Sequence, residues 1–129
     1  MLIGEVAAAG GTTAKTLRFY EQAGLLPEPG RTAGGYRDYD ADVLGRLDFI
    51  RRSRTAGLHL AEIRDILNLR DSGAAPCAHV QNLLTHRLDD LDAQIAELTA
   101  LRATVAELRA GAATLEPATC DPATVCRYV

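Results

Sequence analysis

Eight apolar side chains recur at steps of three or four residues along the second half of this 129-residue chain. They are Leu84, Leu88, Leu91, Ile95, Leu98, Leu101, Val105 and Leu108. This spacing is typical of a coiled-coil seam, with one stammer where Leu101 follows Leu98. A narrow seam on a lone helix has nothing to bury itself against, so the pattern predicts a long helix over residues 76–110 that pairs with another helix.

The partner of this helix is predicted to be the same helix of a second chain. About 33 residues at a rise of 1.5 Å make a rod of roughly 50 Å, which is too long to pack wholly on the part of the chain that precedes it. Two-fold symmetric pairing is the commonest way for a soluble chain to assemble. We therefore expect a homodimer.

Composition restricts the rest of the chain to helices packed through aliphatic side chains. Aromatic residues make up 5% of the sequence and tryptophan is absent, while the strong helix formers leucine and alanine are frequent. No apolar run approaches the about 20 residues of a membrane helix, and no secretory leader opens the chain. We expect a mainly α, cytoplasmic protein that does not bind membranes.

The first half has the outline of a DNA-binding head. The Gly10–Gly11 pair is expected to stop a helix over residues 3–8, and Thr12 or Thr13 to cap a second helix that ends near Ala23. A glycine-rich segment over residues 31–39 suits a small hairpin. A helix, a turn, a helix and a wing form a winged helix-turn-helix, whose second helix enters the major groove.

Two further helices are predicted to complete this head. Asp40 is expected to cap one that ends near Gly57, and another is expected over residues 60–69. Basic residues gather although the net charge is −3, because residues 1–70 hold 10 Lys and Arg against 9 acids, whereas residues 71–129 hold 4 against 8. The acidity therefore lies away from the predicted DNA-binding head.

Several polar side chains of the head are placed to contact DNA. Lys15 and Arg18 share one face of the predicted second helix, while Arg31, Tyr36 and Arg37 lie on the predicted wing. Such side chains bind base edges or phosphates. Arg51, Arg52 and Arg54 form a further basic cluster. For any single arginine, a solvated surface position is an equal alternative.

Motifs along the whole chain resemble those of the MerR family of bacterial transcription regulators. They are Ile3-Gly4-Glu5-Val6-Ala7, Thr16-Leu17-Arg18-Phe19-Tyr20-Glu21, Gly24-Leu25-Leu26, Gly35-Tyr36-Arg37, Phe49-Ile50-Arg51-Arg52 and Gly57-Leu58. The resemblance implies DNA contacts by Lys15, Arg18, Tyr20, Tyr36 and Arg37, although Tyr20 could belong to the core instead. It also implies activation by promoter distortion, with RNA polymerase as a partner. His59 departs from the family's usual Ser or Thr cap.

Three cysteines cannot all pair as disulfides, and their placement suggests a metal site. Cys77 falls in the first turn of the long helix, where the dipole favours a thiolate. Cys120 and Cys126 can share one ion across a short loop. Ten extended residues at about 3.4 Å cannot return the tail along a helix of about 50 Å. In an antiparallel pair, however, Cys77 of one chain would meet Cys120 and Cys126 of the other.

Three sulfurs suit a soft ion such as Hg(II), Pb(II) or Cd(II), and a fourth ligand would allow Zn(II). His79 is a possible fourth ligand, while His86 is expected to face solvent. The resemblance implies a divalent ion, because the family's monovalent copper sensors have Ser where this chain has Cys77. The expected organisation is therefore a winged head over residues 1–72, an antiparallel dimerisation helix over residues 76–110 and a metal-binding loop over residues 111–129.

Other functions remain open at this point. Cys120 and Cys126 could form a redox-sensing disulfide, or the chain could be a monovalent copper sensor of the same family. The sequence has no phosphate-binding glycine loop after a strand, no nucleophile elbow and no His-Glu pairing at metallohydrolase spacing. We therefore expect a regulator of double-stranded promoter DNA without enzymatic activity or an organic cofactor.

Overall fold

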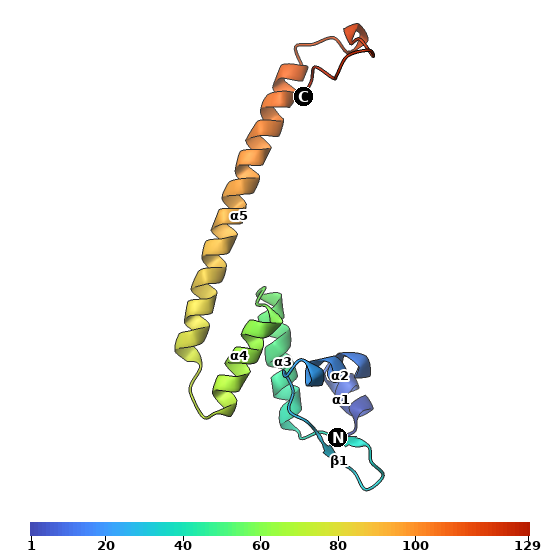
Figure 1. The fold of residues 1–129 in the computed structure, drawn as a ribbon, viewed down its shortest axis with the longest axis vertical. Helices are drawn as coiled ribbons and strands as arrows, with labels where there is room; N and C mark the ends of the chain where they lie inside the picture. Colours follow the sequence, from blue (N-terminus) through green and yellow to red (C-terminus); the bar gives the residue numbers. More distant parts are fainter. The chain divides into compact units, whose positions relative to one another are not determined.

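A computed structural model describes residues 1–129 as a mainly helical chain with one small hairpin (Figure 1), which confirms the predicted fold class. The elements are α1 (Ile3–Ala9), α2 (Ala14–Gln22), β1 (Gly30–Arg31), β2 (Arg37–Asp38), α3 (Asp42–Thr55), α4 (Leu60–Asp71), α5 (Cys77–Ala112) and the 3-10 turn η1 (Pro117–Thr119). The chain forms two compact units, Met1–Arg87 and Leu88–Val129.

The first two helices and the wing match the sequence prediction closely. Thr13 caps α2, because its hydroxyl accepts a hydrogen bond from the Thr16 amide at 3.2 Å. Gly11 adopts a φ of +62° in the turn between α1 and α2, a conformation that side chains disfavour. β1 and β2 pair antiparallel, with Arg31 opposite Arg37. The head therefore has the predicted helix, turn, helix and wing.

Two predicted helix ends were wrong. Asp40 does not cap α3, because the helix begins one residue later, after Ala41, and no side chain caps it. Gly111 lies inside α5 rather than beyond its end, since the helical hydrogen bonds continue from the Ala113 amide to the Arg109 carbonyl at 3.0 Å. At the start of α4, His59 is exposed and its side chain makes no capping hydrogen bond, while its amide donates to Glu62 Oε1 at 2.9 Å.

The core of the first unit is aliphatic, as the composition predicts. Its most deeply buried side chains are Val6, Leu17, Leu25, Ile50, Ile63 and Leu67. Val80 and Leu83, from the first turns of α5, also pack against this core. The beginning of α5 is thus held by burial on the head.

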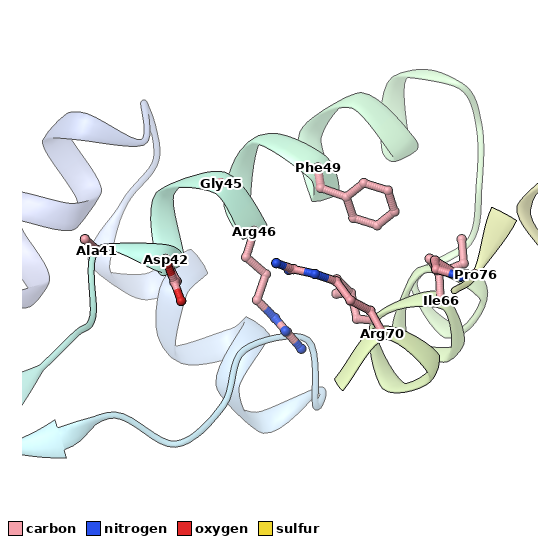
Figure 2. Close-up of a pocket in the computed structure, with 9 residues that line it drawn as sticks. Ala41, Asp42, Gly45, Arg46, Phe49, Ile66, Arg70 and Pro76 are labelled. Atoms are coloured by element: carbon pink, nitrogen blue, oxygen red, sulfur yellow. The ribbon is translucent and has the colours of Figure 1, made fainter. Parts of the chain in front are cut away.

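One buried arginine, Arg46, holds three segments of the head together. From α3 it donates through Nε to the Leu25 carbonyl at 2.7 Å, and through both terminal nitrogens to the Asp71 carboxylate at 2.8 Å. Arg46 and Arg70 both line a hollow of about 440 Å³. Figure 2 shows the two side chains between α3 and α4. Arg46 therefore ties the segment after α2 to the end of α4.

The Arg46–Asp71 pair predicts a pH-dependent stability. Hydrogen bonding to Arg46 holds the pKa of Asp71 below its usual value, so this stabilisation is present above the unfolded pKa and is lost as pH falls through the folded pKa. Because the Asp71 side chain is 48% exposed, we expect Asp71→Asn to lower the free energy of unfolding by only about 1 kcal/mol at pH 7. Urea unfolding at pH 7 and at a pH well below the usual carboxyl pKa of 3.8 would measure it, with Asp65→Asn as the control. An equal loss at both pH values would contradict this account.

Gly57, between α3 and α4, offers a second stability test. Its φ is +83°, and an added Cβ would lie 2.6 Å from Nε of Arg87. The guanidinium can swing aside, so the cost comes mainly from the left-handed backbone, and we expect Gly57→Ala to destabilise the protein by about 1–2 kcal/mol. Thermal unfolding measures this. Gly45→Ala is the control, because Gly45 lies in α3 with nothing near its Cβ position, and it should stabilise slightly. Equal melting temperatures for the two variants would refute the argument.

α5 presents the predicted apolar seam to solvent in the single chain. All eight seam residues are exposed by 36% to 66%. Asp89, Asp90 and Asp92 are also exposed on this helix. No helix is both long enough and apolar enough to cross a bilayer. The seam is therefore an unpartnered apolar face on a helix that also carries exposed carboxylates.

Candidate nucleic-acid interface and thiol site

Four of the six predicted DNA-contact residues line one hollow of about 690 Å³ in the head. Arg18 comes from α2, and Arg31, Tyr36 and Arg37 come from the wing. Tyr36 is 70% exposed, which leaves its ring free to contact a ligand. Residues at the start of α1 complete the lining. The fold thus gathers side chains of α2 and of the wing into one basic surface.

The other two predicted contacts, Lys15 and Tyr20, lie outside this hollow. Lys15 is exposed on α2. Tyr20 packs partly against the core, and it also lines a second hollow of about 410 Å³ with Arg51 and Arg54. The two readings of Tyr20 from the sequence, DNA contact and core residue, are therefore compatible in this structure.

Arg37 also has a partner that the sequence does not predict. Its Nε donates to Glu21 Oε2 at 3.2 Å, and the Tyr39 hydroxyl donates to the other carboxylate oxygen of Glu21. Burial, and then the hydrogen bond to Glu21, raise the pKa of Tyr39 to about 12. Glu21 belongs to the motif that suggested the family, but no local spacing pairs it with the wing. The carboxylate joins α2 to β2.

The basic cluster on α3 is partly neutralised. Arg51 and Arg52 both bind Asp48, at 2.6 Å and 2.9 Å, and the hydrogen bond from Arg51 holds the pKa of Asp48 below its usual value. Arg54 forms no ion pair. Of the three arginines, Arg54 therefore has the charge most available to an anion.

Cys120 and Cys126 line one hollow of about 260 Å³ in the second unit. The loop between them is closed by Asp121, whose carbonyl accepts from the Thr124 amide at 3.1 Å and whose carboxylate accepts from the Ala123 amide at 2.9 Å. These bonds turn the chain so that both cysteines border the same space. Two cysteine sulfurs on one concave surface form a donor pair that fits a soft metal ion.

Tyr128 lies beside this thiol pair. Its hydroxyl oxygen is buried and lacks a hydrogen-bond partner within normal geometric limits. Burial, and then the closeness of the Cys120 thiol, raise the pKa of Tyr128. No spacing motif in the sequence points to Tyr128.

The remaining predicted ligand residues belong to the first unit. Cys77 is the first residue of α5 and is exposed. Nε2 of His79 is buried without a hydrogen-bond partner, whereas His86 is exposed, as expected. The single chain contains no group of three or more His, Cys, Asp or Glu side chains placed to hold a metal ion. The structure thus joins Cys120 with Cys126 but assembles no complete ligand set.

Comparisons with known proteins agree with this architecture. Residues 1–70 match the family described as MerR HTH family regulatory protein, and residues 44–108 match MerR, DNA binding. The HTH-type transcriptional regulator ZntR homolog of Haemophilus influenzae is 38% identical over 109 residues, which cover 84% of this chain and 81% of the relative. The mercuric resistance operon regulatory protein of Bacillus cereus is 35% identical over 107 residues, which cover 83% and 81%.

A solved structure extends the similarity to nearly the whole chain. The transcription regulator PbrR691 from Ralstonia metallidurans CH34, in complex with lead(II), has a TM-score of 0.76 and 40% sequence identity, and the match covers 96% of this chain and 91% of that chain. These relatives are regulators rather than enzymes. The chain therefore belongs to the MerR family of DNA-binding transcriptional regulators, in the branch whose members respond to metal ions.

Proposed function

We propose that this protein is a homodimeric regulator of a metal-resistance promoter, and that a thiophilic divalent ion is its inducer. The observation that carries this proposal is the hollow that Cys120 and Cys126 line together. Their two sulfur atoms suit a soft ion but do not complete its ligand set. Cys77, exposed at the start of α5, supplies the third sulfur. The lead(II) complex of PbrR691 supports a metal role for this architecture.

The third sulfur comes from the second subunit. A straight helix of the length of α5, 36 residues, spans about 54 Å, whereas the segment from Ala112 to Cys120 reaches at most about 28 Å. An antiparallel pair of α5 helices would bury the exposed seam and place the start of one helix beside the end of the other. Each dimer would then hold two sites, each made of Cys120, Cys126 and Cys77 of the partner subunit.

The donor set favours ions that accept three thiolates, namely Hg(II), Cd(II) or Pb(II). Zn(II) prefers four ligands, and His79 is the candidate for the fourth because its Nε2 is buried without a partner. When bound, such an ion joins sulfurs from two subunits. The protein's own part is to hold Cys120 and Cys126 in one loop and Cys77 at the end of a rigid helix.

The division of labour follows the sequence prediction. Residues 1–72 bind double-stranded promoter DNA, residues 76–110 dimerise, and residues 111–129 bind the ion. The proposed DNA contacts are Lys15, Arg18, Tyr20, Arg31, Tyr36 and Arg37, supported by the basic hollow that four of them line. Binding of the inducer distorts the bound promoter so that RNA polymerase can engage it. The protein acts in the cytoplasm, where that DNA is found.

A chelator-competition titration tests the metal proposal. The reduced dimer is titrated with Hg(II), Cd(II), Pb(II), Zn(II) and Cu(I) while thiolate-to-metal absorption and stoichiometry are followed. We expect two divalent ions per dimer, with Cys120→Ser lowering affinity by more than about 100-fold, because even residues outside the ligand set contribute tenfold or more. His86→Ala is the matched control and should change nothing.

Two other outcomes would overturn the divalent-ion assignment. Tight binding of Cu(I) alone would make the protein a monovalent copper sensor. A protein that binds no ion but whose transcription responds to peroxide would be a thiol redox regulator, a role that the shared hollow of Cys120 and Cys126 could also serve.

A further inference from the structure

We infer that Glu21 is a positioning residue for DNA recognition, which acts by orienting Arg37 and fixing the wing against the recognition helix. This inference rests on the proposed DNA contact of Arg37. Glu21 is the third residue after Arg18 on α2 and carries a negative charge close to the surface proposed to bind DNA. Taken alone, such a charge should repel phosphates.

The contacts of Glu21 explain why a carboxylate stands there. Glu21 is only 13% exposed and Arg37 28%, so their 3.2 Å ion pair is shielded from much of the solvent. One carboxylate oxygen accepts from Arg37, and the other accepts from the hydroxyl of Tyr39, which is buried. Both oxygens therefore hold residues 37–39 beside α2.

The hydrogen bond between Arg37 and Glu21 leaves the two terminal nitrogens of the guanidinium free. Glu21 receives only Nε, and no hydrogen bond within the chain uses the two terminal nitrogens. Those nitrogens can donate as a pair to a phosphate oxygen while Nε stays on Glu21. Arg37 borders the same hollow as Arg18, Arg31 and Tyr36. Glu21 thus sets the direction of an arginine that contacts DNA, while Glu21 itself makes no contact with DNA.

This role predicts that Glu21→Gln changes the affinity for DNA in the direction opposite to that expected from charge alone. Glu21→Gln removes one negative charge from each subunit, which by charge alone would tighten DNA binding. If Glu21 orients Arg37, the same change replaces the ion pair with a neutral hydrogen bond that holds the guanidinium less firmly. We then expect DNA binding to weaken roughly five- to tenfold, with a shallower salt dependence because phosphate contacts are lost. The direction of the change therefore distinguishes the two accounts.

The test uses the full-length dimer and two duplexes. One is selected by the wild-type protein from a pool with a randomised centre, and the other is a random-sequence duplex of the same length. Fluorescence anisotropy over a salt series gives the affinity and its salt slope for wild type, Glu21→Gln, Arg37→Ala and the double variant. Glu28→Gln, which removes an exposed unpaired carboxylate, is the charge-matched control.

We expect Glu21→Gln to weaken binding to the selected duplex, and to have no further weakening effect once Arg37 is alanine. Additive losses, or tighter binding by Glu21→Gln as by Glu28→Gln, would overturn the inference and leave the DNA contact of Arg37 intact. If Arg37→Ala itself leaves affinity unchanged, the proposed contact fails first. Circular dichroism melting and metal stoichiometry check that each variant is folded.

Discussion

A mixed dimer that pairs a Cys77→Ser subunit with a Cys120→Ser/Cys126→Ser subunit is expected to bind one divalent ion. In a site shared between subunits, the intact Cys77 of the second subunit meets the intact tail of the first, while the opposite site has lost every sulfur. Each parent homodimer has no complete site and should lose more than about 100-fold in affinity. Two different affinity tags isolate the mixed dimer, and thiolate-to-metal absorption counts the ions.

The same mixed dimer separates the shared site from its alternative. If every site were built within one chain, one subunit would lack Cys77 and the other would lack its tail pair, so no ion would bind tightly. A mixed dimer of wild type with Cys77→Ser is the positive control and should also bind one ion. Absence of binding by the first mixed dimer beside normal binding by this control would rule out sites shared between subunits.

The double substitution Leu91→Glu/Ile95→Glu is expected to dissociate the dimer. Burying each of these side chains contributes about 1.5–3 kcal/mol, and in a symmetric dimer each change occurs twice. The dissociation constant should therefore rise by at least about 10,000-fold. Analytical ultracentrifugation over a concentration series measures it, and the sites that need Cys77 of the partner subunit should be lost together with the dimer.

Ala93→Glu is the matched control for this prediction. Ala93 is exposed on α5 and stands two residues from both Leu91 and Ile95, hence about 200° around the helix from each. The Ala93→Glu substitution adds a carboxylate to the same stretch of helix but outside the seam, so the dimer should persist. If Ala93→Glu dissociates the dimer as strongly as the double substitution, the pairing face is not the seam.

The sequence predicted the features that depend on local periodicity and turn chemistry. The seam, the Thr13 cap and the hairpin can each be recognised within a few residues of chain, because helical spacing, capping oxygens and glycine turns act locally. The predicted cap of α3 was one residue too early, because Asp40 is a better capping residue than Ala41, which occupies the cap position. The Gly111 prediction failed because a glycine signals a helix end without forcing one.

The unpredicted features are pairings across long stretches of chain. Arg46 meets Asp71 across 25 residues and Arg37 meets Glu21 across 16. In the sequence, each of these residues is indistinguishable from an ordinary surface charge. The packing of α3 on α4 brings Arg46 to Asp71, and the packing of the wing on α2 brings Arg37 to Glu21. The approach of Tyr128 to Cys120 likewise depends on how the tail folds back on itself.

In the proposed dimer, the exposed carboxylates of α5 would give the molecule a preferred approach to DNA. Residues 71–129 carry four more acidic than basic side chains, whereas residues 1–70 carry one more basic than acidic side chain. The field of a nucleic acid therefore attracts one part of the molecule and repels the other, which acts as an electrostatic torque during encounter. Collisions that present α5 to the DNA are discouraged before contact. This orientation weakens as salt rises, because charges beyond about 10 Å are already largely screened at 0.1 M.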